Sequence, residues 1–139
     1  MEVNLWAVLA ATVAMFAVSA FWYMVPFAKI WGEMHGFDKL SAKQQKEMQS
    51  KMGPFYGVQL LVTIVSAYVL AHFIVALPSV SPYELVGWLW LGFVLPTQVS
   101  AVIFGGTKPQ YVAQKIAIMA GEALLHLVVA AWVISLFTK

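Results

Sequence analysis

Four long apolar runs dominate this chain. They cover residues 3–25, 55–77, 83–104 and 111–137, and only three charged residues occur within them. A helix rises about 1.5 Å per residue, so about 20 apolar residues cross a hydrocarbon core roughly 30 Å thick. Each run is long enough to cross once, which predicts an all-α fold, an integral membrane bundle of four transmembrane helices. The runs and their connections fill the chain, so we expect residues 1–139 to form a single four-helix transmembrane domain.

The connections between the runs differ in length. The first, residues 29–53, is long and polar, whereas the other two are short turns rich in glycine and proline. Within the long connection, Ser41 and Gln44 have the spacing of a helix capping box, and the Gly-Pro pair at 53–54 supplies a stop. We therefore expect a short amphipathic helix over residues 42–52 in the first loop. It would lie either on the membrane surface or in water as a linker.

Composition supports the membrane class and excludes several others. Hydrophobic residues make up 62% and charged residues 10%, against roughly 45–50% and 25% in soluble domains. The net charge of +2 is small and lies in the loops, so nucleic acid is not an expected partner. The absence of cysteine excludes disulfides and cysteine-bound metals, and no metal site is predicted. The absence of arginine removes the usual bidentate group for phosphate or carboxylate capture.

Lysine positions predict the orientation. Seven of the eight lysines lie in or beside the first and third connections, and only Lys139 lies on the other side. Under the positive-inside rule, loop 29–53 is cytoplasmic and both termini lie outside a cell (inner) membrane that the chain crosses several times. The first run is not expected to be a cleavable signal, because no basic stretch precedes it and it exceeds the usual 7 to 15 apolar residues.

Polar residues inside the runs predict which faces point inward. On the last run, Lys115, Glu122 and His126 share one helical stripe. Polar residues of the other runs lie at about the same depth in the membrane as Glu122: Ser19, Thr63, Thr97 and Gln98. Two aromatic residues, Trp22 and Tyr23, lie near them. We predict that these groups line a cytoplasm-facing polar pocket around Glu122, although they could equally be hydrogen-bonding contacts that hold the helices together. The candidate ligand- or proton-binding residues are Glu122, His126, Ser19, Trp22, Tyr23, Gln59, Thr63, Thr97 and Gln98.

Glu122 is the most informative of these residues. A carboxylate near the bilayer centre is costly, so it is either a proton, ion or ligand site or a structural group, and both interpretations stay open. A haem between His72 and His126 is not expected, because His72 lies on the opposite side of its helix from Thr63. No cofactor is predicted. His35 is given no role, and Trp90 is assigned to lipid contact or an interfacial belt.

Two groups of residues resemble a known family. The first group comprises Asn4, Ala7-Val8, Phe21-Trp22-Tyr23, Pro26-Phe27-Ala28-Lys29, Trp31 and Gly36. The second comprises residues 90–97, Trp-Leu-Gly-Phe-Val-Leu-Pro-Thr, and the turn that ends in Lys108-Pro109. Together they resemble the small four-span membrane proteins of the domain of unknown function 1761 family, over nearly the whole chain.

The resemblance implies a four-helix membrane fold but no activity, so no catalytic residue follows from it. The chain also departs from the family pattern, because Gly105-Gly106 replaces the usual acidic residue of the third connection. Glu122 and His126 match nothing in the family signature. The predicted pocket therefore has no support from the resemblance.

Three classes of function remain. The first is a protein that binds or transports a small ligand or proton through the pocket around Glu122. The second is a structural or accessory membrane subunit without a ligand. The third is a small membrane enzyme, because glutathione-handling membrane enzymes have a similar size and number of spans. It is less favoured, because this chain has no arginine. The lipid bilayer, a small-molecule ligand and a second copy in a homodimer are the expected partners.

Overall fold

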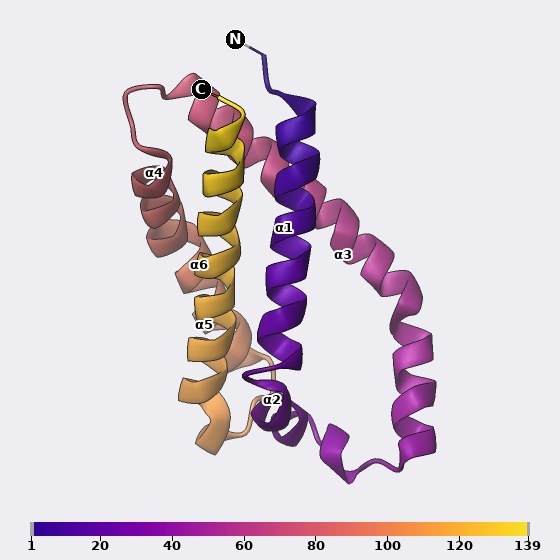
Figure 1. The fold of residues 1–139 in the computed structure, drawn as a ribbon. Coiled ribbons are helices and arrows are strands. Elements are labelled where there is room, and N and C mark those ends of the chain that lie inside the picture. Colours follow the sequence, from indigo (N-terminus) through magenta and orange to yellow (C-terminus); the bar gives the residue numbers. More distant parts are fainter. Residues whose placement is uncertain (1, 139) are drawn as a thin grey trace.

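The computed structural model describes residues 2–138, and Figure 1 shows that they form a helical bundle. No strand occurs among these residues, which confirms the all-α prediction. The elements are α1 (Leu5–Met24), α2 (Ala28–Met34), the 3-10 turn η1 (Phe37–Lys39), α3 (Ala42–Ala76), α4 (Pro82–Leu89), the π-helical turn η2 (Trp90–Val94), α5 (Leu95–Phe104), the 3-10 turn η3 (Pro109–Tyr111) and α6 (Val112–Leu136).

Four helical segments are long and apolar enough to cross a membrane. They are Leu5–Met24, Ala42–Ala76, Pro82–Phe104 and Pro109–Leu136, and the third joins α4, η2 and α5. Large apolar side chains cover much of the outside, as expected where lipid replaces water; Phe104, for example, is 88% exposed. The predicted four-span architecture is confirmed, and the chain is a multi-pass membrane protein.

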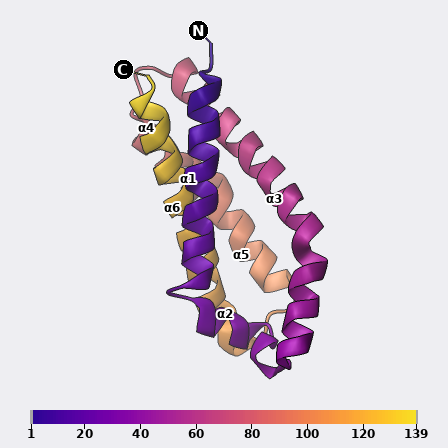
Figure 2. The same cartoon turned by 45° about the vertical axis from the view of Figure 1, so that its right-hand side comes forward.

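The two ends of the bundle differ in charge. Figures 1 and 2 show both termini at one end, with α2 and the start of α3 at the other. The turn between α5 and α6 also lies at this second end, which we call the lysine-rich end. Helix α6 runs beside α1 and also contacts α4 and α5. The lysines of the lysine-rich end are Lys29, Lys39, Lys43, Lys46, Lys51, Lys108 and Lys115.

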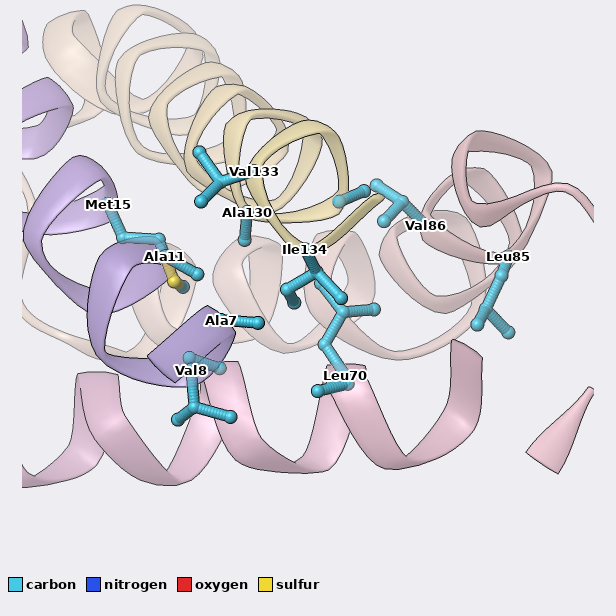
Figure 3. Close-up of a cluster of buried hydrophobic side chains, with 13 residues drawn as sticks. Ala7, Val8, Ala11, Met15, Leu70, Leu85, Val86, Ala130, Val133 and Ile134 are labelled. Carbon is cyan, nitrogen blue, oxygen red and sulfur yellow. The ribbon is translucent and has the colours of Figure 1, made fainter. Parts of the chain in front are cut away.

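The buried core lies where α1, α3, α4 and α6 meet, and Figure 3 shows its side chains. Small residues allow this close approach: Ala11 on α1 and Ala130 on α6 are both 0% exposed. Helical spacing predicts close packing along a stripe through Ala7, Ala10, Ala14 and Ala17, but only Ala7 is buried, whereas Ala10 and Ala14 are half-buried and Ala17 is exposed. The tightest face of α1 therefore lies one residue away from that stripe and includes Ala11.

The start of the second span both confirms and corrects the prediction. Ser41 and Gln44 form the predicted capping box, with backbone-to-side-chain bonds of 2.9 and 3.2 Å. The helix does not stop at residues 53–54, however, but continues to Ala76. Pro54 removes only one backbone hydrogen bond, so the helix bends there and continues instead of ending. Figure 1 shows that α3 runs in two directions. The short helix of the first loop is α2 instead.

The third span contains a widened turn. The backbone N–H of Leu95 donates to the carbonyl of Trp90, one residue further back than in an α-helix. Pro96 follows directly and has no N–H to donate, so the wide turn accommodates the break that a proline causes. One extra residue in a turn rotates the rest of the helix by about 100°. Thr97, expected on the inner face, is accordingly exposed.

Candidate functional site

The candidate site is centred on Glu122, near the middle of α6. Its side chain is buried, with 8% of the residue exposed. The hydroxyl of Ser19 on α1 donates to Glu122 Oε1, and His126 Nδ1 lies 2.7 Å from the same oxygen. His126 is one helical turn further along α6, which gives the i, i+4 geometry of neighbours on a helix face. The structure thus brings together three of the predicted residues by direct hydrogen bonds.

Both bonds go to one oxygen, and this determines where protons can reside. An ionised carboxylate only accepts, so His126 donates from Nδ1 and its Nε2 is left to accept or to carry a second proton. The second carboxyl oxygen, Oε2, has no hydrogen-bond partner among residues 2–138 and is not fully enclosed by them. The cluster of Glu122, His126 and Ser19 therefore offers two positions, Oε2 and Nε2, to a proton or to a polar ligand.

Two tryptophans hold the turn of α6 that precedes Glu122. Trp22 Nε1 on α1 donates to the carbonyl of Ile118 at 3.0 Å, and Trp90 Nε1 on η2 donates to the carbonyl of Ala120 at 2.9 Å. The Trp22 ring also lies over Gly121, where an added Cβ would come within 3.2 Å of Trp22 Cζ2. The backbone that carries Glu122 is thereby fixed from two sides.

The role of Trp90 corrects the assignment to a lipid-facing belt. Its indole N–H bonds to a neighbouring helix inside the bundle rather than to the membrane interface. One sequence signal could have identified it: an indole N–H in the middle of an apolar run needs an acceptor, and lipid tails offer none. Its exact partner on α6 could not be read from spacing, because that partner belongs to another span.

Tyr23 packs towards the lysine-rich end. Its ring lies against Trp31 of α2, with centroids 4.7 Å apart, and among residues 2–138 no hydrogen bond joins it to Glu122. Lys115 was placed on the same α6 stripe as Glu122, but its Nζ bonds His35 Nε2 at 3.1 Å. Within the described residues, no lysine forms an ion pair with Glu122.

Four further predicted residues, like Trp22 and Tyr23, do not bond to Glu122 directly. Thr63 donates to the Gln59 carbonyl at 2.7 Å, and Gln59 Nε2 donates weakly back to the Thr63 hydroxyl at 3.4 Å. Thr97 donates to the carbonyl of Phe93 within its own helix. Gln98 is half-buried and has no hydrogen bond to any described residue. These side chains complete local contacts or face open space, and they do not extend the Glu122 cluster.

Two surface hollows lie away from the cluster. One, of about 450 Å³, is lined by lysines and other polar residues near the start of α3. The other, of about 400 Å³, lies beside Glu84, Trp88 and Leu124. Neither is lined by Glu122. Among residues 2–138, no group of three or more His, Asp or Glu side chains is arranged to hold a metal ion.

Comparisons with known proteins place the chain in a family of unknown function. No curated protein and no solved structure gave a match. A family described as "Protein of unknown function (DUF1761)" matches through its sequence model over residues 6–135, a range that includes all residues that carry the resemblance except Asn4. Because this match covers nearly all of the four-span bundle, the chain belongs to that family.

Proposed function

We propose that this protein takes up a proton at the pair formed by Glu122 and His126, and that the proton controls binding or movement of a small ligand through the membrane. One observation carries this proposal. Glu122 is buried in the middle of a span, and its recorded partners, Ser19 and His126, carry no fixed positive charge.

The argument rests on the cost of charge inside a bilayer. A lysine or arginine partner would form a permanent ion pair, whose net charge does not change near neutral pH. Histidine can be neutral or positively charged in that range, and a desolvated carboxyl group can hold a proton. The pair of Glu122 and His126 can therefore change its net charge by one proton, which a purely structural contact does not require.

The structural alternative uses the same contacts. The Ser19 hydroxyl links α1 to α6 through Glu122, so the cluster could serve only to hold two helices together. Interhelical hydrogen bonds in membranes contribute about 0.6 kcal/mol on average. Neutral side chains can provide such bonds without a buried carboxylate, which favours a role for the charge.

Replacement of Glu122 by glutamine tests the proposal. The side chain is nearly isosteric, so we expect the variant to fold and Ser19 to keep a hydrogen-bond acceptor. In the unmodified protein, the infrared absorption of protonated carboxyl groups should rise as pH falls, and the Glu122→Gln variant should lose the component of this change that comes from the buried carboxyl group. Glu84→Gln, at an exposed position on α4, is the matched control and should retain it.

Stability measurements on the same variant separate the two interpretations. A proton site predicts that Glu122→Gln keeps its stability in detergent but loses the pH dependence of ligand binding, with bound molecules detected by native mass spectrometry. His126→Gln should weaken that pH dependence, whereas His72→Gln, at an exposed position on α3, should not. Loss of stability with binding that is intact and still pH-dependent would contradict the proposal.

We also propose that the lysine-rich end faces the cytoplasm. Seven lysines lie at that end and Lys139 is the eighth, which is the asymmetry that the positive-inside rule associates with the cytoplasmic side. A reporter that is active only in the cytoplasm should stay inactive when fused after Lys139 and become active when inserted near Asp38. Activity of the fusion at Lys139 would reverse the orientation.

A further inference from the structure

A second histidine lies at the lysine-rich end, outside the Glu122 cluster. His35 follows α2, and its Nε2 is 3.1 Å from Nζ of Lys115 on α6. Its Nδ1 is 2.8 Å from the carbonyl of Trp31. The His35 ring also packs against Trp31, with centroids 4.5 Å apart. Residues far apart in the sequence, in the first loop and in the last helix, are thus joined through one imidazole.

The chemistry of the two partners fixes the protonation of this contact. The Trp31 carbonyl only accepts, so His35 donates to it from Nδ1. A charged lysine only donates, so His35 Nε2 accepts from Lys115 and the imidazole is neutral. If His35 took a second proton, two N–H groups and two positive charges would face each other across 3.1 Å. The contact is compatible with one positive charge on the pair and not with two.

Lys115 makes a second contact with α2. Lys115 Nζ also lies 5.7 Å from the centroid of the Trp31 ring, close enough for a cation–π interaction. Lys115 of α6 therefore contacts both His35, the C-cap of α2, and Trp31 within α2. In the described part of the chain, these two are the polar side-chain contacts between α6 and α2. Trp31 also packs against Tyr23 of α1, and α2 lies at the lysine-rich end of the bundle (Figure 1).

We propose that His35 is a pH-sensitive latch that docks α2 against α6 while the imidazole is neutral and releases α2 when it is protonated. Docking needs the neutral form, so it is expected at higher pH and is lost once the imidazole takes a second proton. Release would uncover the lysine-rich end of the bundle. The latch does not depend on a role for Glu122.

The charges around the latch favour this direction of the response. Lys115 is the charged group that faces His35 from α6, and Tyr23 is the titratable group that faces Trp31 from α1. Glu33 and Asp38 are close in sequence, but within residues 2–138 neither forms an ion pair with His35 or Lys115. No recorded carboxylate would therefore offset the second positive charge.

A distance measurement between α2 and α6 tests the latch in the full chain. The protein has no cysteine, so Met34→Cys with Gln114→Cys gives two unique positions for spin labels. We expect a short, narrow distance distribution by electron double resonance at pH 8 and a longer, broader one at pH 5. A second pair, Ala17→Cys with Leu125→Cys, lies within α1 and α6, and an unchanged distance there shows that the bundle remains folded.

Variants at both partners complete the test. His35→Gln keeps an acceptor for Lys115 but cannot gain a proton, so α2 should stay docked at both pH values. Lys115→Met removes the second charge and should abolish the pH response, and His72→Gln should retain it. Equal distances at pH 8 and pH 5 in the labelled parent, or a full response in His35→Gln, would overturn the latch. The response should persist in Glu122→Gln, so the two proposals can fail separately.

Discussion

Replacing Ala11 with leucine is expected to lower the free energy of unfolding in detergent by about 1–3 kcal/mol. Ala11 is 0% exposed and lies in the core cluster where α1 approaches α3 and α6. Three extra carbons at that position must displace either the neighbouring helix or nearby core side chains, because close-packed interiors have no room for them. Unfolding of the purified protein by a denaturing detergent gives the difference.

Ala17→Leu on the same helix is the matched control. Ala17 is exposed, so the added side chain would point into lipid or detergent and should change stability by less than about 0.5 kcal/mol. Equal effects of the two substitutions would mean that the packed face of α1 does not run through Ala11.

Replacing Gly121 with leucine should have a larger effect, at or above the upper end of that range, about 3 kcal/mol. A Cβ alone would lie 3.2 Å from Trp22 Cζ2, which is tighter than nearly all such contacts. A full leucine would push the indole away and break its 3.0 Å bond to the Ile118 carbonyl. The loss should appear both as lower stability and as a red-shifted tryptophan emission, since the indole would become more exposed.

The double variant Gly121→Leu with Trp22→Ala isolates the cause. If the clash with the indole is responsible, removal of the ring should recover part of the loss, and a double-mutant cycle should give a clear coupling energy. Gly57→Leu, at an exposed glycine of α3 with no atom near its Cβ, should cost little. Purely additive effects would show that Trp22 and Gly121 do not contact each other.

Local rules were sufficient to predict the spans and one helix start. Each span was predicted from the length of an apolar run, because every backbone group in lipid must be bonded within its own helix. The start of α3 at Ser41 followed from the capping-box spacing, which depends on residues only three apart. The pairing of Glu122 with His126 was likewise predictable, since one helical turn separates them.

Contacts between helices decided the rest. Local rules place a stop at Pro54, but α3 continues through it, because one lost backbone bond costs less than breaking an otherwise continuous span. Spacing placed Lys115 in line with Glu122, yet Lys115 turns to His35, a residue 80 positions away. The indole of Trp90 bonds the Ala120 carbonyl on α6, a partner that no spacing within its own span identifies. A sequence pattern fixes which face of a helix is polar, whereas the neighbour that this face meets depends on how separate helices pack and rotate against one another.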